Sequence, residues 1–287
     1  MITAEIIADS MHPEGTSRLI TYVLTYPRFL HAEFMTHRMF SRNAQSSRAV
    51  PVLKRIQAVI DNPAIPLVFT KNKAGMQGGE PLADQDEARR VWLEGRDEAV
   101  KVARKLAALE VHKQYANRVI EPYDHISVIA SATDLENFFA LRIHVKALPE
   151  IAALAEQMYA CMQKSVPHAC VYGEWHLPFI SAIEKEITNR LNVAEMDNLV
   201  KRSVARCARV SYLNHDGKKT TVEEDLQLYA RLLGDFPIHA SPAEHQALPM
   251  REPEYIGNFY RWKQHRKQLR GENACYVGTG KVRDTHE

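Results

Sequence analysis

Residues Ser17–Arg48 read SRLITYVLTYPRFLHAEFMTHRMFSRNAQSSR, and three different local structures are expected along this stretch. Ser17–Tyr26 is rich in β-branched and aromatic residues, which predicts a strand. Pro27 suits the first turn of a helix, and the apolar residues of Pro27–Phe40 recur near helical spacing. Ser41–Pro51 is polar with small side chains, so it is predicted to be a loop at the end of that helix.

The rest of the chain is predicted to be mostly helical. The clearest helix is Asp84–Leu109, where apolar residues recur on one broad face between charged residues. A second strand is expected at Ile126–Ser131, and Thr220 or Thr221 is expected to cap the helix Thr221–Leu233. Further helices are expected at Leu53–Ile60, Val111–Val119, Asp134–Ala140, Leu148–Gln163, Ile183–Asn192 and Met196–Val210, with loops at Asn62–Pro81 and Ser211–Gly217. These elements predict an α+β fold: a helix-rich single domain over residues 1–270 around a modest sheet, with a flexible tail over residues 271–287.

Length, charge and hydropathy exclude several classes of protein. The chain of 287 residues can bury a sizeable core, and its net charge of +2 gives no global field to attract a nucleic-acid polymer. No apolar run reaches the roughly 20 residues that a membrane span needs. The first residues, MITAEIIADSMHPEG, lack the basic start and apolar core of a signal peptide. We therefore expect a cytoplasmic protein that binds no nucleic-acid polymer and no membrane.

The cysteines do not form a metal-binding pattern. Cys161, Cys170, Cys207 and Cys275 contain no C-x-x-C pair, and no Cys/His group has a usual zinc spacing. We expect four reduced, mostly buried thiols and no metal site.

The segment Thr36–Arg48 concentrates side chains that bind anions. It holds His37, Arg38, Arg42 and Arg48 among serines and side-chain amides. A phosphate is bound by forked guanidinium donors together with hydroxyl and backbone N–H groups. The segment is therefore a candidate phosphate site, and on residue types alone a solvated basic loop is the alternative.

The same segment resembles the signature of the flavin-dependent thymidylate synthases. That signature reads R-H-R, then seven residues, then S, with an arginine two residues further on. Here the pattern is Thr-His-Arg at 36–38, seven residues, Ser46 and then Arg48. Thr36 stands where the family usually has its first arginine, and Ala44 stands where it often has a glutamate, so one contact is expected to differ at each position.

Four more segments are similar to segments of this family. NRVIEP at Asn117–Pro122 is similar to A-R-x-x-L-P, and SATDLENFFALR at Ser131–Arg142 is similar to N-x-R-x-x-x-N-F-x-x-L-R. ARVSY at Ala208–Tyr212 resembles A-R-V-S-[FY], and HASPAEH at His239–His245 resembles H-x-[ST]-P-x-E-H. In better-known members the last two segments precede the arginine signature. The sequence therefore looks circularly permuted, which a fold with close termini tolerates.

The resemblance implies an FAD-dependent enzyme that converts dUMP to dTMP, with methylenetetrahydrofolate as carbon donor and NADPH as reductant. It also implies the family's fold with a mainly antiparallel sheet, and a homotetramer with sites built across subunits. Arg142 is the implied catalytic residue, which faces the pyrimidine and stabilises negative charge on the ring. The implied dUMP ligands are Arg38, Gln45, Ser46, Ser47, Arg48, Arg118 and Arg142. The implied flavin ligands are His37, Arg38, Asn43, Asn137 and Ser241.

Two other functions stay open at this point. A sibling enzyme would be a flavin-dependent hydroxymethylase that leaves a hydroxymethyl group on dUMP or dCMP. A non-catalytic nucleotide- or RNA-binding relative is kept open by Thr36, Ser131 and Thr133, which replace residues that the family usually carries.

Two further segments carry hypotheses of their own. Gly257–Leu269, GNFYRWKQHRKQL, is basic with interleaved aromatic residues and is expected to form an amphipathic terminal helix. The alternative is that Arg261 or Arg266 supplies the cationic contact that Thr36 lacks. Glu174–His176 pairs an acid with an imidazole, which can do acid–base work, although a structural role is the more frequent one.

Overall fold

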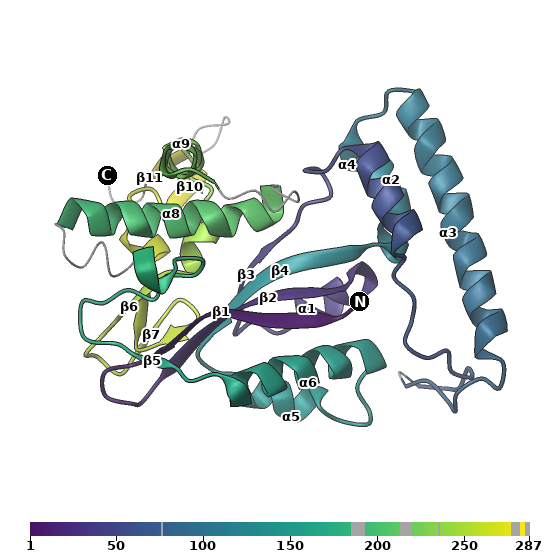
Figure 1. Ribbon diagram of the computed structural model, residues 1–287, viewed down its shortest axis with the longest axis horizontal. Helices are drawn as coiled ribbons and strands as arrows, with labels where there is room; N and C mark the ends of the chain where they lie inside the picture. Colours follow the sequence, from purple (N-terminus) through teal and green to yellow (C-terminus); the bar gives the residue numbers. More distant parts are fainter. Residues whose placement is uncertain (76, 185–192, 213–219, 235, 277–281, 285–287) are drawn as a thin grey trace.

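A five-stranded sheet lies at the centre of the computed structural model, which describes residues 1–75, 77–184, 193–212, 220–234, 236–276 and 282–284 (Figure 1). The strand order is β3-β4-β2-β1-β5. The strands are β1 (Thr3–Met11), β2 (Arg18–Pro27), β3 (Ser41–Ala44), β4 (His125–Ala132) and β5 (His168–Ala169). Only β1 and β5 run parallel, so the expectation of a mainly antiparallel sheet is confirmed.

The segment between β2 and β4 differs from the sequence-based expectation. The helix expected over Pro27–Phe40 is only a 3-10 turn, η1 (Arg28–Leu30), followed by one helical turn, α1 (His31–Phe34). The guanidinium of Arg42 donates to the backbone carbonyls of Met35 at 2.8 Å and His37 at 3.1 Å, and so holds the chain in a turn after α1.

The loop expected at Ser41–Pro51 begins instead with a strand. Ser41–Ala44 forms the edge strand β3 by pairing with Val128–Ser131 of β4. A strand far along the chain supplies these backbone hydrogen bonds, so the polar side chains of β3 do not prevent it.

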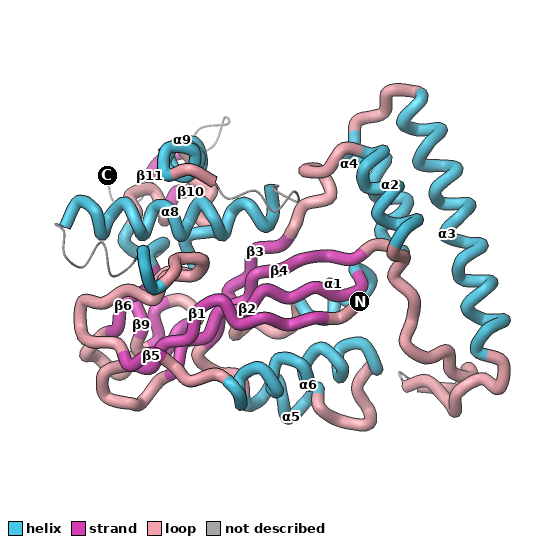
Figure 2. Tube along the Cα trace, in the orientation of Figure 1, coloured by secondary structure: helices cyan, strands magenta, loops and turns pink. Residues whose placement is uncertain are grey.

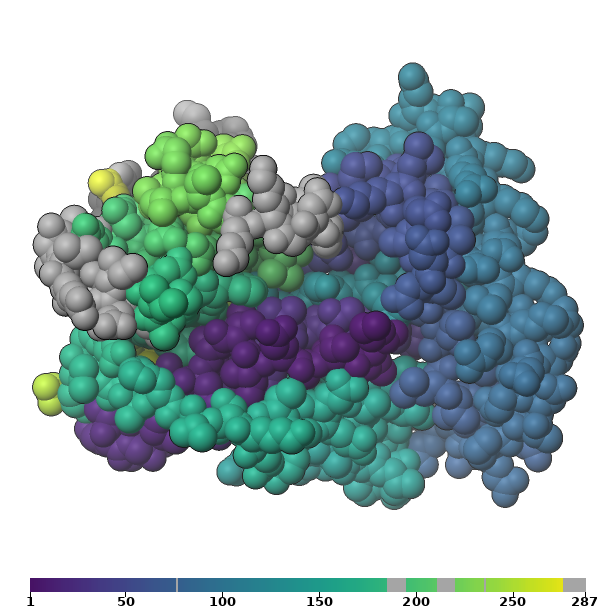
Figure 3. All heavy atoms as spheres, viewed as in Figure 1, coloured from purple at the N-terminus to yellow at the C-terminus, as the bar shows by residue number. Residues whose placement is uncertain are grey.

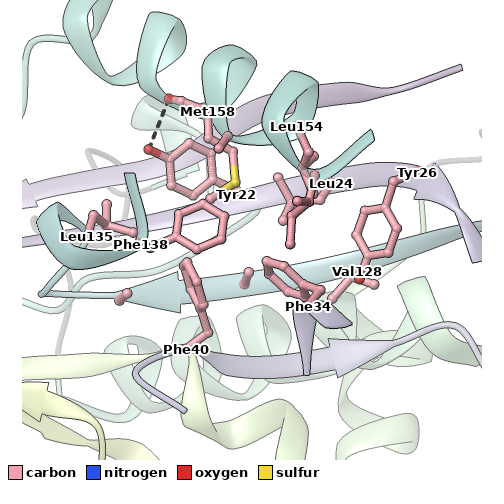
Figure 4. Close-up of a cluster of buried hydrophobic side chains, with 14 of the residues drawn as sticks. Tyr22, Leu24, Tyr26, Phe34, Phe40, Val128, Leu135, Phe138, Leu154 and Met158 are labelled. Carbon is pink, nitrogen blue, oxygen red and sulfur yellow. Dashed lines mark hydrogen bonds between the residues drawn. The ribbon is translucent and has the colours of Figure 1, made fainter. Parts of the chain in front are cut away.

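One face of the sheet is covered by α5 (Glu136–Arg142) and α6 (Pro149–Lys164), as Figure 2 shows. The main core lies in this layer and includes Tyr22, Leu24 and Tyr26 of β2 (Figure 4). Phe40 and Phe138 meet edge to face with ring centroids 5.2 Å apart. The residues of α5 are therefore held against the chain that precedes β3 by aromatic packing.

Two helices from the second half of the chain pack on β3 and β4. They are α8 (Val193–Tyr212), which contacts both strands, and α9 (Val222–Leu233), which packs on α8. Thr221 is the N-cap of α9 and forms a capping box with Glu224. The other candidate cap, Thr220, donates its hydroxyl to Asp225 at 2.7 Å instead.

A third group of helices lies at the far end of the sheet. It contains α2 (Val52–Asp61), α3 (Gln85–Ala108), α4 (Lys113–Ala116) and the 3-10 helix η2 (Asn117–Tyr123). Buried apolar side chains of α2, α3 and η2 form a cluster of their own. The long helix expected from Asp84 is confirmed as α3, whereas the helix expected over Val111–Val119 is split into α4 and η2.

The C-terminal part is built from short strands and 3-10 turns, so the prediction of an amphipathic helix over Gly257–Leu269 is wrong. The elements are η3 (Ser241–Glu244), β6 (Ala247–Pro249), β7 (Tyr255–Ile256), β8 (Phe259–Tyr260), β9 (Trp262–Gln264), η4 (His265–Gln268), β10 (Ala274–Tyr276) and β11 (Val282–Asp284). Gly257 and Arg261 adopt φ of +65° and +64°, which a helix does not allow. The chain pairs instead as β6 with β9 and β7 with β8.

Two expectations fall largely outside the part of the chain that is described. Most of the helix expected over Ile183–Asn192 and of the loop expected over Ser211–Gly217 lies in residues 185–192 and 213–219. Within the described ranges, no helix combines the length and apolar character that crossing a membrane requires.

Candidate active site

Arg142 and His37 meet although 105 positions separate them in the chain. Arg142 ends α5, and its Nε–H donates to Nε2 of His37 at 2.7 Å. Its Nη1 forms an ion pair with Glu33 of α1. The His37 ring packs edge to face on Phe138, with centroids 4.8 Å apart. Two residues that the sequence assigned to ligands therefore form one polar group at the core's edge.

The environment of His37 sets its charge. The side chain is buried, and burial together with the positive charges of Arg142 and Arg42 lowers its pKa to about 4. His37 is therefore neutral near pH 7. Since its Nε2 accepts a hydrogen bond from Arg142, its proton is on Nδ1, which is a donor.

The serine-rich part of the signature is held by the segment NRVIEP. Asn117 is fully buried, and its amide donates to the backbone carbonyls of Ser47 at 2.7 Å and Val50 at 2.9 Å. Arg118 follows Asn117 and is exposed, as is Arg48. Within the described ranges Arg48 has no side-chain partner, and Arg118 has one long contact, to Glu121 at 3.5 Å. Two nearly unpaired cations thus flank a loop whose backbone is fixed.

Two more of the matched segments join the same edge of the sheet. The amide of Asn43 in β3 donates to the carbonyl of Cys207 in α8 at 2.8 Å, next to the ARVSY segment. Ser131 of β4 lies 2.8 Å from Nδ1 of His245, in the HASPAEH segment. All five segments therefore converge around β3 and β4, although more than 200 residues separate the first from the last.

In Figure 3 the outline of the molecule is indented between the α8–α9 part and the α2–α3 part. The segment that joins β3 to α2 runs between these two parts (Figure 1). This segment, residues 45–51, contains the serines and Arg48 of the signature.

The predicted site residues differ in exposure. His37, Asn43, Gln45 and Ser47 are buried, Ser46 and Arg142 are half-buried, and Arg38, Arg48, Arg118, Asn137 and Ser241 are exposed. Within the described ranges, the side chains of Arg38, Asn137 and Ser241 have no hydrogen bond or ion pair, and nothing links them to the His37–Arg142 pair.

Two residues contribute to this site that the sequence did not single out for it: Glu33 binds Arg142, and Asn117 fixes the loop of residues 45–51. Arg42, one of the candidate anion ligands, closes the turn after α1 instead. Glu33 contacts Arg142 across 109 positions of the chain, so no local pattern signals its role.

The hypothesis that Arg261 or Arg266 replaces the missing arginine at Thr36 gains no support. Arg261 is buried and binds Glu14 at 2.7 Å and Thr16 at 2.8 Å. Arg266 forms ion pairs with Glu244 and Glu272. Both cations are therefore neutralised by carboxylates of other segments.

His176 has the structural role that was the alternative for the segment Glu174–His176. Its ring is fully buried and lies 2.8 Å from the hydroxyls of both Thr21 and Ser10. Its two nitrogens are thereby satisfied inside the fold, which leaves neither for a substrate.

These features define a mixed helix-and-sheet protein in which Arg142 contacts His37 and in which Asn117 fixes the loop of residues 45–51. The model of one family, described as thymidylate synthase complementing protein (Thy1), matches residues 17–168, which is more than half of the chain. The chain belongs to this family. Comparison with curated proteins finds no significant match.

Two solved structures illustrate the similarity. A UMP/dUMP methylase PolB from Streptomyces cacaoi, bound with 5-Br dUMP, is 18% identical, covers 57% of this chain and 90% of its own, and has a TM-score of 0.48. A flavin-dependent thymidylate synthase ThyX from Helicobacter pylori, complexed with FAD and dUMP, is 17% identical and has a TM-score of 0.37. The match covers 50% of this chain and 67% of that chain.

Proposed function

We propose that this chain is an FAD-dependent thymidylate synthase that methylates dUMP to dTMP, with methylenetetrahydrofolate as carbon donor and NADPH as reductant. The observation that carries the proposal is the contact of Arg142 with neutral His37, in the segment that precedes β3. Membership of the Thy1 family supports it. A cytoplasmic homotetramer with sites across subunits is part of the proposal.

The exposed cations are assigned to the phosphate of dUMP. Arg38 and Arg48 have no carboxylate partner in the described residues, and Arg118 has only its long contact to Glu121. Guanidinium groups free of carboxylates can form the bidentate bonds that a phosphate accepts. Gln45, Ser46 and Ser47 would complete the nucleotide contacts from the loop that Asn117 fixes.

Arg142 is assigned to the pyrimidine ring. Its Nε–H is directed to His37 and its Nη1 to Glu33, so the guanidinium has a fixed orientation. Within the described part of the chain its Nη2 has no partner, and this group can donate to an oxygen of the base. A positive donor held in place stabilises the negative charge that develops on the ring, without reorganisation.

The donor set is compatible with FAD. The pyrophosphate and ring atoms of FAD accept hydrogen bonds, and Arg38, Asn137 and Ser241 have donors that no described residue uses. His37 adds its Nδ1–H, whereas the amide of Asn43 already donates to Cys207 in the same chain and fits less well. These residues would hold and orient the cofactor, which supplies the redox chemistry when bound.

An anaerobic reaction tests the proposal. The purified chain is mixed with FAD, NADPH, methylenetetrahydrofolate and dUMP, and the nucleotide products are identified by mass spectrometry. Formation of dTMP is the expected outcome. A hydroxymethylated nucleotide would replace the proposal with the sibling activity, and no product from a chain without flavin absorbance would identify a binding-only relative.

A further inference from the structure

Three side chains with metal-binding chemistry gather at the edge of the sheet opposite to β3. A ring nitrogen of His168, Sγ of Cys170 and a carboxylate oxygen of Glu174 all lie within 4.8 Å of one another. The sequence predicted no metal site, because H-x-C-x-x-x-E is not one of the usual zinc spacings. The structure therefore groups donors that the spacing did not indicate.

The fold holds these residues in place through backbone contacts. His168 begins β5 and pairs with Ser10 of β1, and the N–H of Cys170 donates to the carbonyl of Met11 at 3.0 Å. A tight turn follows, closed by a hydrogen bond from the N–H of Glu174 to the carbonyl of Val171 at 3.0 Å. This turn returns the carboxylate of Glu174 to the imidazole.

The carboxylate of Glu174 is oriented at both oxygens. One oxygen lies 2.6 Å from Nε2 of His168, and the other accepts the N–H of Val171 at 3.2 Å. A backbone donor on the outer oxygen of a ligating carboxylate is a usual second contact in metal sites, where it fixes the inner oxygen toward the ion.

The geometry and exposure of the three donors suit a divalent ion of the zinc class. Thiolate, imidazole and carboxylate are the ligands of Zn²⁺, and tetrahedral bonds of about 2.1 and 2.3 Å place two donors about 3.6 Å apart. The present separations need side-chain shifts of only about 1 Å to meet this value. Cys170 is 3% exposed, whereas the side chain of His168 is 57% exposed. The fourth coordination position of the ion would therefore face water.

We propose that His168, Cys170 and Glu174 bind one divalent cation of the zinc class, with the fourth position open to solvent. Binding releases the proton of the Cys170 thiol to solvent as the metal takes its place, and the imidazole of His168 binds in its neutral form with its proton on the other ring nitrogen. The site lies at β5 and the proposed nucleotide site at β3, which are the two opposite edges of the sheet. The two proposals are therefore independent, and either can fail without the other.

A cobalt titration of the chelator-treated full chain tests this site. We expect one Co²⁺ per chain, with a sulfur-to-cobalt charge-transfer band and tetrahedral d–d bands that Zn²⁺ abolishes on competition. Cys170→Ser is expected to remove the charge-transfer band. His168→Ala and Glu174→Gln are expected to weaken binding at least about tenfold. Cys161→Ser and His144→Ala remove the same types of donor elsewhere and are expected to change nothing.

Several results would overturn the proposal. One is the absence of stoichiometric cobalt or zinc binding, and another is a charge-transfer band that persists in Cys170→Ser or disappears in Cys161→Ser. Because Cys170 is buried, Cys170→Ser is checked by circular dichroism. If that variant does not fold, His168→Ala and Glu174→Gln test the site in its place, because both positions reach the surface. Unchanged affinity for Co²⁺ in both variants would refute the site.

Discussion

His37 and Arg142 form a pair in which each side chain controls a property of the other. Arg142 lowers the pKa of His37, and the neutral ring in turn accepts the Nε–H of Arg142. Burial is the larger cause of the lowered pKa, and Arg42 adds a second positive charge. The imidazole of His37 therefore remains neutral over the whole physiological range of pH.

Removal of the positive charge of Arg142 should change the titration of His37. In Arg142→Gln we expect the pKa of His37 to rise from about 4, and to stay below 6.5 because burial and Arg42 persist. NMR of the imidazole ring as a function of pH measures this change. Arg104→Gln, which removes an exposed arginine of α3, is the control. A pKa that falls or does not move in Arg142→Gln would contradict the assignment.

The two classes of arginine in the proposed site should affect catalysis differently. Arg142→Gln is expected to lower kcat about 100-fold, because the lost donor acts on charge that develops in the transition state. Arg48→Ala is expected to raise KM for dUMP with a smaller effect on kcat, because a phosphate contact is equally strong before and during the reaction. Steady-state kinetics with dUMP measure both. The assignment fails if the variants show the reverse pattern while Arg104→Gln matches the parent chain.

At the scale of elements, α8 and α9 are joined by a buried carboxylate. Asp225 is fully buried and lies 3.0 Å from Nε of Arg206 and 3.2 Å from Nη2 of Arg209, and it accepts the hydroxyl of Thr220 at 2.7 Å. Loss of this carboxylate leaves Arg209 without an ion-pair partner among the described residues, whereas Arg206 keeps its pair with Glu184 at 2.9 Å.

Asp225→Asn is therefore expected to lower the free energy of unfolding by about 3 kcal/mol. Urea denaturation followed by circular dichroism measures this change. Glu223→Gln alters an exposed carboxylate of the same helix and is expected to lower the free energy of unfolding much less. A loss in Asp225→Asn no greater than that in Glu223→Gln would show that the carboxylate does not join the helices.

At the scale of the whole molecule, buried histidines couple stability to pH. Burial lowers the pKa of His245 to about 3 and of His265 to about 4, below the value of 6.5 for an exposed histidine. The unfolded chain therefore binds protons at these positions before the folded chain does. The stabilisation is fully present above pH 6.5 and is lost as the pH falls toward the folded values.

The free energy of unfolding is accordingly expected to decrease from pH 6.5 to pH 4, by up to about 1.4 kcal/mol per pH unit for each of the two histidines. Urea denaturation at a series of pH values measures this slope. His245→Asn keeps a polar group beside Ser131 and is expected to reduce the slope. An equal slope in the variant would exclude His245 as a source.

Some predictions at this scale remain untested by the fold. They are the circularly permuted order of the segments, the single domain over residues 1–270 and the homotetramer. The family match covers residues 17–168, so the ARVSY and HASPAEH segments lie beyond it. The contact of Cys207, next to ARVSY, with β3 and the contact of His245 with β4 come from the structure alone.

The sequence by itself determined the elements whose causes are local. The strand β2, the long helix α3 and the capped helix α9 follow from side-chain periodicity and from capping residues, which act within a few positions along the chain. The concentration of guanidinium and hydroxyl groups in Thr36–Arg48 is also a local feature of the sequence, and anion binding by this segment stays a prediction.

The tertiary structure alone decided the features that depend on distant partners. The polar segment Ser41–Ala44 becomes a strand because β4 offers it hydrogen bonds, and Gly257–Leu269 becomes short strands because β6 pairs with β9. The contact of Arg142 with His37 and the return of Glu174 to His168 have the same origin. Each depends on the backbone of residues far along the chain or on a turn between them, and the local pattern of side chains does not encode either.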